Sequence, residues 1–358
     1  MAKKAVPMPG DSTILYLLLG AILISNVVNF YQVASVYSTT ADVMKLVQAK
    51  TPTQPASPTT PTTPTAPTQP DTPDVEVKMT VLNDKTCSMC DASGIISSLK
   101  TQVFNNLKVT EIDYSSAEGK SLAESMGIEK LPAYIFDGSV ISSKNYQMVQ
   151  QYLQKSGSSY LLRAGGNMLI GREATTKPTI ALFVMSHCPY GTMAEDNMKE
   201  VVDTFKDSID FKVYFIANDN GQGGFDSLHG QPEVDENIRQ LCAMDKAPTK
   251  WFDYILCRNK NIQSTDWQAC ATGAGIDANT IKTCSEGTQG KQLLTENIKL
   301  ANELQIGSSP TFLINNRYTF GGALPAEGIK QNLCQANPGL AGCEKTLSGA
   351  AGAAPAAG

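Results

Sequence analysis

Two short segments carry cysteines in the patterns that thiol–disulfide exchange uses. The sequence C-S-M-C begins at Cys87, and C-P-Y-G begins at Cys188. The thiolate is the nucleophile in this exchange, and the second cysteine of a C-x-x-C pair resolves the mixed disulfide that the first one forms. We therefore expect Cys87 to attack and Cys90 to resolve. Cys188 has Gly191 where its resolving cysteine would stand, so its release needs another thiol, for which the Cys87/Cys90 pair is the candidate.

Other interpretations of these cysteines stay open. The C-x-x-C pair is also compatible with a structural disulfide or with half of a zinc site, and Cys188 with a degenerate domain that only retains it. A zinc site usually needs a second pair of ligands, and the chain has no second C-x-x-C and only two histidines, His187 and His229. The sequence contains no dinucleotide fingerprint, phosphate loop or H-E-x-x-H motif, so we expect no cofactor beyond the sulfur atoms.

The elements around the first motif follow from the spacing of apolar residues. Alternation predicts a strand before the C-x-x-C motif, and helical spacing predicts a helix after it. Asp137-Gly138 is typical of a hairpin turn into a short strand. The expected elements are, in order, strand 75–82, a helix that includes residues 95–104, strand 107–112, helix 117–126, strand 133–136, strand 140–141 and helix 145–153.

This order resembles a minimal thioredoxin fold over residues 76–160. The resemblance rests on the C-x-x-C motif at a strand-to-helix junction and on Pro132 before the third strand. It implies a cis peptide bond at Pro132, which would face the dithiol. It also implies a helix that begins at the motif, where the helix dipole and free N–H groups lower the pKa of the attacking thiol. One departure is Thr86, since thioredoxins usually carry Trp before the first cysteine.

The second region, residues 161–343, repeats this order with a long insertion. We expect a hairpin over 160–172, and then an apolar strand that leads into Cys188. Pro310 takes the position that Pro132 has in the first region. The further expected elements are strand 179–185, helix 193–205, strand 211–216, a mainly helical insertion over about 225–305, strand 311–314, a tight turn at Asn315-Asn316, strand 318–320 and helix 325–333.

The insertion resembles that of DsbA-type proteins, and part of it resembles the gamma-interferon-inducible lysosomal thiol reductase family. That family carries C-Q-H-G-x2-E-C-x2-N-x4-C, which this chain matches at His229, Gly230, Glu233, Asn237 and Cys242. At the positions of its other two cysteines and its glutamine the chain has Ser227, Val234 and Leu228. The resemblance implies an α/β protein with two tandem thioredoxin-like domains and the activity of a thiol–disulfide oxidoreductase.

The two histidines have competing roles. His187 precedes Cys188 directly, and it either helps to form the thiolate or points to solvent. His229 lies in the insertion, where a structural role as a cap competes with a catalytic one. The catalytic candidates from the sequence are therefore Cys87, Cys90, Cys188, Pro132 and Pro310.

Six further cysteines remain, and six cysteines allow fifteen pairings. We favour nested pairs across helical hairpins for the four in the insertion, and a small closed loop for the last two. The favoured pairs are Cys242–Cys284, Cys257–Cys270 and Cys334–Cys343. A structural disulfide contributes about 2–4 kcal/mol, so these bridges would act as staples.

The N-terminal segment predicts a membrane anchor. Lys3 and Lys4 precede an apolar run over 12–31, about the 20 residues that a spanning helix needs, and they favour a cytoplasmic N-terminus. A cleaved signal peptide is the alternative, but its apolar region would be shorter. Residues 51–75 carry proline at nearly every third position, which indicates an extended polyproline II stalk. The tail over 344–358, rich in Ala and Gly, is expected to be disordered.

These features together define the expected function. The net charge of −5 argues against nucleic-acid binding, and an extracytoplasmic location after the anchor would let disulfides persist. We expect a single-pass, membrane-anchored extracytoplasmic thiol–disulfide oxidoreductase that acts on exported proteins and exchanges with a separate redox partner. The alternatives are a redox-inactive thioredoxin-fold module that binds peptides or acts as a chaperone on a stalk, and a structural protein of the cell surface.

Overall fold

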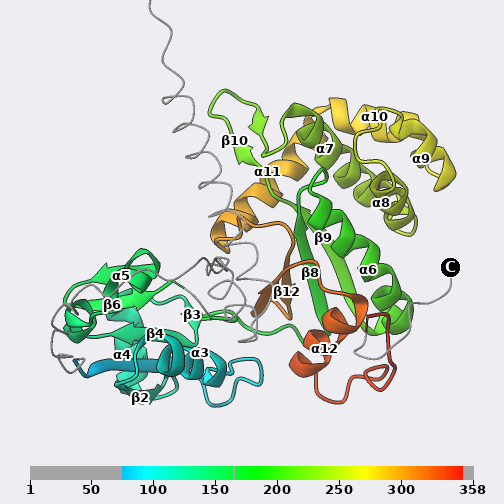
Figure 1. Ribbon diagram of the computed structural model, residues 1–358. Helices are drawn as coiled ribbons and strands as arrows, with labels where there is room; N and C mark the ends of the chain where they lie inside the picture. The colour runs from blue at the N-terminus through cyan, green and yellow to red at the C-terminus, as the bar shows by residue number, and fades with distance from the viewer. Residues whose placement is uncertain (1–74, 164–165, 350–358) are drawn as a thin grey trace, which may run out of the picture.

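A computed structural model of the protein describes residues 75–163 and 166–349, which form two mixed α/β parts (Figure 1). The anchor expected over 12–31, and the stalk up to residue 74, lie outside these residues. Among the described residues, none of the helices has both the length and the apolar character needed to cross a membrane.

The first part, residues 75–163, is a sheet with helices packed on it. Its elements are β1 (Val77–Asn83), α3 (Ser93–Ser98), a π-helical turn (Leu99–Val103), β2 (Leu107–Asp113), α4 (Ala117–Met126), β3 (Lys130–Leu131), β4 (Ala133–Phe136), a 3₁₀ turn (Gly138–Ser142), α5 (Tyr146–Val149), a 3₁₀ turn (Gln150–Tyr152), β5 (Leu153–Ser156) and β6 (Ser159–Leu162). Strand β1 pairs in parallel with β2 and antiparallel with β4. The described strands of this sheet follow the order β2-β1-β4-β6-β5, and β3 belongs to the other sheet.

The second part contains a longer sheet and the helical insertion. Its elements are β7 (Met168–Leu169), β8 (Thr179–Val184), α6 (Pro189–Phe205), a 3₁₀ turn (Lys206–Ser208), β9 (Asp210–Phe215), β10 (Asn218–Asp219), β11 (Phe225–Asp226), α7 (Gln231–Lys246), α8 (Trp251–Asn259), α9 (Trp267–Gly273), α10 (Ala278–Glu286), α11 (Thr288–Glu303), β12 (Thr311–Ile314), β13 (Tyr318–Gly321) and α12 (Ala326–Ala336). Within the described chain the strand order is β3-β7-β13-β12-β8-β9. Strand β3 therefore ties the first part to the second sheet.

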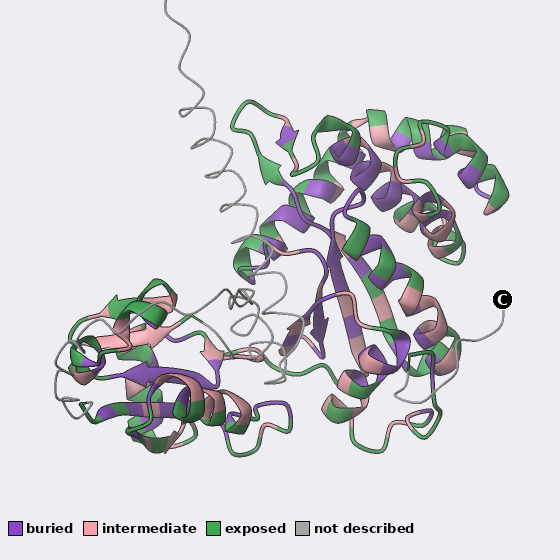
Figure 2. Cartoon of the chain, viewed as in Figure 1, coloured by how far each residue is buried: buried purple, intermediate pink, exposed green. Residues whose placement is uncertain are grey.

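Alternation along the strands explains how each sheet is covered. Met79 and Val81 of β1 are buried under α3, whereas Cys90 is buried with Leu82 and with Met168 of the second part. In the second sheet, Leu182 and its alternate neighbours on β8 pack under α6 and α12, and the opposite face of β8 packs against α11. The buried residues accordingly run along both sheets, and the exposed ones lie on the outer helix faces (Figure 2).

The insertion is mainly helical, as the sequence predicts. Helices α7 to α10 gather beyond one end of β8 and β9, with α11 returning along the sheet (Figure 1). Three disulfides connect Cys242 with Cys284, Cys257 with Cys270, and Cys334 with Cys343. All three favoured pairings are thus confirmed. The first joins α7 to α10 and the second joins α8 to α9, so each one closes a helical hairpin.

Three sequence predictions for residues 137–172 are wrong. Residues 138–142 form a 3₁₀ turn rather than a hairpin and a strand, because the Asp137 carboxylate accepts the N–H of Ser139 and caps that turn. The helix expected over 145–153 shortens to α5 and one 3₁₀ turn, after which the chain forms β5 and β6. The hairpin expected over 160–172 does not form, because β6 pairs with β4 and β5 while β7 pairs with β3 and β13.

The start of the expected disordered tail is ordered as far as residue 349. Leu347 is buried in the second core, and its N–H donates to Glu327 Oε2 at 2.8 Å. This part of the tail is ordered because Leu347 is the one large apolar side chain in a run of small residues, and burying it is worth about 1.5–3 kcal/mol.

Candidate functional site

The first candidate centre is the loop that follows β1. Cys87 and Cys90 form a disulfide with each other. The loop closes as two turns, with Cys87 N–H donating to Asp84 O at 3.0 Å and Cys90 N–H donating to Cys87 O at 3.3 Å. Cys87 is half-buried and Cys90 is buried, so an approaching thiol reaches Cys87 first. This asymmetry matches the roles that the sequence predicts for the two sulfurs, which stay predictions.

The helix after this loop starts later than the resemblance implies. Helix α3 begins at Ser93, three residues past Cys90, because the Asp91 carboxylate accepts the Ser93 N–H at 2.8 Å and holds a turn there. The expectation that the motif occupies a helix N-terminus is therefore wrong. Hydrogen bonds from the Ser93 side chain and backbone lower the pKa of Asp91, so a carboxylate charge sits beside the loop instead of free N–H groups.

The cis peptide bond predicted at Pro132 is confirmed, and a second one precedes Pro310. The Leu131–Pro132 and Ser309–Pro310 peptide bonds are cis. Cys90 Sγ lies 3.9 Å from Leu131 O, so the proline stands beside the disulfide. Leu131 belongs to β3, which pairs with β7 of the second sheet, and Pro132 follows directly after that strand.

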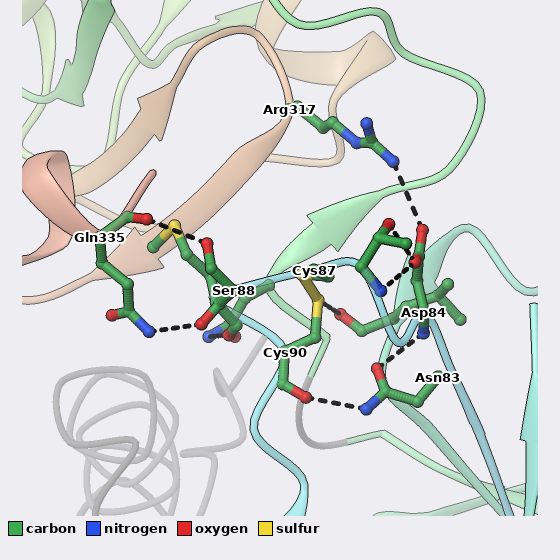
Figure 3. The surroundings of a disulfide bond; sticks show 11 residues. Asn83, Asp84, Cys87, Ser88, Cys90, Arg317 and Gln335 are labelled. Atoms are coloured by element: carbon green, nitrogen blue, oxygen red, sulfur yellow. Dashed lines mark hydrogen bonds and ion pairs between the residues drawn. A yellow bond between two sulfur atoms is a disulfide. The ribbon is translucent and has the colours of Figure 1, made fainter. Parts of the chain in front are cut away.

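The first loop is also held directly by the second part (Figure 3). Ser88 Oγ donates to Gln335 O at 2.9 Å, and Gln335 Nε2 donates back to Ser88 O at 2.5 Å. Arg317 lies 3.6 Å from the Asp84 carboxylate, and Asn167 Nδ2 donates to the main-chain carbonyl of Met89 at 3.3 Å. The loop between the two cysteines is thus docked against the end of α12 and the turn before β13.

The second candidate centre is Cys188 at the N-terminus of α6. Cys188 is the N-cap residue and Pro189 follows in the first turn, which suits proline because that position needs no N–H partner. The helix therefore starts four residues earlier than predicted. The Cys188 thiol is free and buried, and it donates to Ser309 O, 3.7 Å from Sγ, beside the cis-proline Pro310.

The packing around Gly191 leaves no room for a resolving cysteine. A Cβ atom on residue 191 would lie 2.7 Å from Ser309 Oγ and 3.2 Å from Met185 O. Ser309 Oγ is itself held, because it accepts the Met185 N–H at 3.0 Å. Sequence reasoning found the missing cysteine but not Ser309, whose only signal is that it precedes Pro310.

The two centres lie at opposite ends of β12. Cys188 contacts Ser309, just before Thr311, whereas Arg317, which contacts the first loop through Asp84, follows Ile314. A strand rises about 3.3 Å per residue, so about 10 Å of strand separates the two ends, and a disulfide needs sulfurs about 2 Å apart. This spacing favours separate exchange partners for the two centres, and the release of Cys188 by Cys87/Cys90 stays a prediction.

Residues of the thiol reductase signature hold the segment that leads to Cys188. The Glu233 carboxylate is fully buried, and its Oε2 accepts the His187 N–H at 2.9 Å. Asn237 Oδ1 accepts the Ser186 N–H at 3.1 Å, and Ser186 Oγ donates to Glu233 O at 3.3 Å. The signature thus fixes the backbone before the thiol from a helix of the insertion.

The two histidines differ in their surroundings. His187 is buried, which excludes the solvent-facing alternative, and burial lowers its pKa although the nearby Glu233 charge opposes the shift. A neutral imidazole at neutral pH gives the Cys188 thiolate little electrostatic help. His229 is partly exposed, and its Nδ1 lies 2.7 Å from Glu233 Oε2.

A groove with a volume of about 650 Å³ opens at Cys188. Cys188, His229 and Ser309 contribute to its lining, with Tyr190 and Leu228. Tyr190 and Leu228 are 53% and 68% exposed, and together they form an apolar rim on the groove. The groove therefore combines a thiol, an imidazole and an exposed apolar rim.

A buried acid lies two helical turns beyond Cys188. Glu195 on α6 is fully buried, and neither carboxylate oxygen has a hydrogen-bond partner among the described residues. Burial raises its pKa to about 8, so it carries a proton at neutral pH. The sequence signal was an acidic residue on the apolar face that includes Ala194 and Met198, and it was missed.

These features define a thioredoxin-like thiol centre with a helical insertion, and the comparisons with known families agree. The family "Gamma interferon inducible lysosomal thiol reductase (GILT)" matches residues 179–274, and the "DSBA-like thioredoxin domain" matches residues 238–333. Both are families of thiol–disulfide oxidoreductases, and the chain is an enzyme of this class. The matches lie within the second part, so the thioredoxin resemblance of residues 76–160 stays a prediction.

Solved structures of similar shape are related only distantly. The thiol-disulfide exchange protein alpha-DsbA2 from Wolbachia pipientis is 14% identical, with 46% of this chain and 83% of that chain covered and a TM-score of 0.36. Oxidised BdbD from Bacillus subtilis is 14% identical, with 46% of this chain and 89% of that chain covered and a TM-score of 0.38. A periplasmic thioredoxin-like protein from Salmonella enterica serovar Typhimurium is 15% identical, with 45% of this chain and 84% of that chain covered and a TM-score of 0.36. No curated protein matches the sequence.

Proposed function

We propose that the protein is a membrane-anchored extracytoplasmic enzyme that exchanges thiols and disulfides with exported proteins. The observation that carries this proposal is the closed Cys87–Cys90 disulfide in a loop beside the cis-proline Pro132, with Cys87 the more accessible sulfur. Cys87 takes the attack of a substrate thiol, or attacks a substrate disulfide when reduced. In the second case Cys90 resolves the mixed disulfide and the substrate is reduced; in the first case a second substrate thiol resolves it and the substrate leaves as a disulfide.

Cys188 acts as a second centre in this proposal. It forms a mixed disulfide that a thiol from another molecule releases, because residue 191 is a glycine. A cysteine at that position would collide with Ser309. The redox partner that supplies this thiol is therefore a separate molecule. The distance between the two ends of β12 argues against exchange between the centres.

The location rests on two independent features of the chain. Lys3 and Lys4 followed by the apolar run over 12–31 support a retained anchor with a cytoplasmic N-terminus. The three disulfides of the second part support a compartment in which disulfides persist. Fractionation of the full chain and of a chain lacking 12–31 tests the anchor: loss of the full chain from the membrane fraction would overturn it.

The enzymatic proposal is tested by reduction of a disulfide-linked substrate such as insulin in the presence of an added thiol. Cys87→Ser is expected to abolish the activity of the first centre. Ser88→Ala is the matched control in the same loop, because it leaves both thiols in place and retains activity. Full activity of a variant that lacks both Cys87 and Cys188 would refute the proposal.

A second function is favoured by the exposed rim of the Cys188 groove. Tyr190 and Leu228 present apolar surface that an extended peptide would cover, as a chaperone or peptide-binding module requires. Suppression of aggregation of an unfolded client by a variant that lacks Cys87, Cys90 and Cys188 would support this function. Loss of that suppression together with the thiols would favour the enzymatic function alone.

A further inference from the structure

We propose that His229 is a catalytic acid–base residue for the exchange reaction at Cys188. This inference rests on the proposed function of Cys188 as a thiol centre. It assigns a chemical role to the histidine of the thiol reductase signature, which otherwise has only its structural contact with Glu233.

His229 and Cys188 share one groove. Both contribute to the lining of the cavity of about 650 Å³, although they come from different segments of the chain. The His229 side chain is 34% exposed, so it is open to a molecule in the groove, whereas the other histidine, His187, is buried. A thiol or disulfide that enters the groove to reach Cys188 therefore meets the His229 imidazole.

Glu233 fixes the orientation and the tautomer of this imidazole. Its buried carboxylate lies 2.7 Å from His229 Nδ1 and also accepts the His229 N–H at 3.2 Å and the hydroxyl of Ser227. A neutral imidazole next to a carboxylate donates from Nδ1, which leaves the lone pair on Nε2. Nε2 has no partner within the described part of the chain, so it is available to a ligand.

The packing at Gly191 explains why Cys188 needs such a group. Since Ser309 occupies the place of a resolving cysteine, the thiol that releases Cys188 comes from solution and is mostly protonated at neutral pH. An ordinary dithiol centre avoids this step, because its second thiol is already in place. A base in the groove compensates by producing the thiolate where it reacts.

The step that follows conserves atoms and charge. His229 Nε2 takes the proton of an incoming thiol R–SH, and the resulting thiolate attacks the outer sulfur of the mixed disulfide Cys188–S–S–R′. The bond to Cys188 breaks while R–S–S–R′ forms, so the incoming thiol is oxidised and Cys188 is reduced. The protonated imidazole then returns its proton to the Cys188 thiolate.

Several titratable groups surround the His229 ring, and their charges influence the pH dependence of the reaction at Cys188. Glu233 on α7, His187 before α6 and Asp226 on β11 lie around the imidazole or in the same groove. Behind them, Glu236 and Arg258 form a buried ion pair. The residues that α11 and the segment 306–309 contribute to the groove are uncharged.

The size of the effect is bounded. A thiol with a pKa of about 8.5 is ionised to roughly one part in thirty at pH 7, so a base that delivers it fully as thiolate accelerates the reaction by at most about 30-fold. The gain falls as the pH approaches the pKa of the thiol. It disappears above about pH 9, where the thiol ionises without help.

The test uses the full chain with its four disulfides intact, in which Cys188 is the only free thiol. Cys188 is labelled with cystine, and the return of its free thiol on addition of free cysteine, a thiol with a pKa of about 8.5, is followed by acid quenching and alkylation between about pH 6 and pH 9. His229→Asn retains an amide donor for Glu233 but removes Nε2. It is expected to lower the rate at pH 7 by up to about 30-fold and to leave the rate above about pH 9 unchanged.

Gln231→Ala is the matched control, because Gln231 is exposed on the same segment, outside the groove lining, where it contacts Asp235; it is expected to keep the rate and the pH profile of the native chain. Equal rates for native and His229→Asn proteins at pH 7 would overturn the inference and leave the proposed function of Cys188 standing. Failure of native Cys188 to accept the label would overturn that function itself. Should His229→Asn not fold, two thiols of different pKa are compared on the native chain: rates that follow the thiolate fraction alone would overturn the role of His229.

Discussion

Ser309 Oγ lies 2.7 Å from the point that a Cβ atom on Gly191 would occupy. Real side chains do not approach this closely, and the hydroxyl is fixed by the Met185 N–H. The packing between α6 and the segment before β12 therefore leaves no space for a second thiol at position 191. The second centre therefore differs from a dithiol centre in its packing as well as in the absence of one cysteine.

We first predict that Gly191→Cys does not create a working dithiol. The new Cβ collides with Ser309 Oγ, and overpacking of this kind costs about 1–3 kcal/mol in the free energy of unfolding. Combining Gly191→Cys with Ser309→Ala removes the blocking atom, recovers part of that stability and allows a disulfide between Cys188 and the introduced thiol. Urea unfolding and thiol counting measure both effects. Gly191→Ala is the control without a thiol, and an unchanged stability in that variant would contradict the steric account.

A second prediction concerns the docking of the first loop on α12. Gln335→Ala removes the side-chain hydrogen bond to Ser88 O and weakens the reciprocal bond to the main chain, each worth about 1 kcal/mol, and is expected to speed reduction of Cys87–Cys90 by dithiothreitol about 5- to 10-fold. The control is Gln331→Ala, one turn earlier on the same helix, where the side chain contacts Glu327 instead. Equal reduction rates in the two variants would show that the docking does not restrict the loop.

The third prediction is the direction of electron flow at the first centre. The disulfide precedes α3 by three residues and lies beside Asp91, whose pKa is lowered by its hydrogen bonds with Ser93. Without a helix N-terminus to stabilise the thiolate, we expect a reduction potential nearer that of thioredoxin, about −270 mV, than that of DsbA, about −120 mV. Equilibration with dithiothreitol measures it. A potential above about −180 mV would mean that another group stabilises the thiolate.

Glu195 gives a prediction for stability against pH. Its pKa is about 8 in the folded chain and 4.5 as an ordinary glutamate, so between these values the folded state keeps a proton that the unfolded state releases. The stability contributed by the neutral acid is present below about pH 4.5 and is lost as the pH rises to about 8, by up to about 1.4 kcal/mol per pH unit. Glu195→Gln is expected to remove this slope in urea unfolding. Parallel slopes for the two proteins would contradict a neutral Glu195.

The sequence was sufficient for the parts of the fold that local patterns determine. Apolar periodicity located the strand before each candidate centre, as well as α4 and α12, and the turn at Asn315-Asn316 has the positive φ angles that asparagine tolerates. The helical hairpins of the insertion were regular enough to predict Cys242–Cys284 and Cys257–Cys270, and the small loop after α12 predicted Cys334–Cys343.

The errors fall where long-range pairing or a single side chain decides the structure. Met168 pairs with β3 and β13, for which the local sequence holds no signal, and the Asp91 side chain delays α3 beyond the motif. The candidate site shows the same division. The cysteines and prolines were visible in the sequence, whereas Ser309 and Glu195 matter only because of what surrounds them in three dimensions.

We infer that the chain holds two separate sulfur centres, each of which exchanges with other molecules. Cys90→Ala leaves Cys87 unable to resolve its mixed disulfides, so its partners are trapped and are identified by mass spectrometry of the non-reduced peptides. The expected products have Cys87 linked to added substrate or to a small thiol, with Cys188 linked separately or free. A Cys87–Cys188 peptide as the main product from a monomer would contradict this inference.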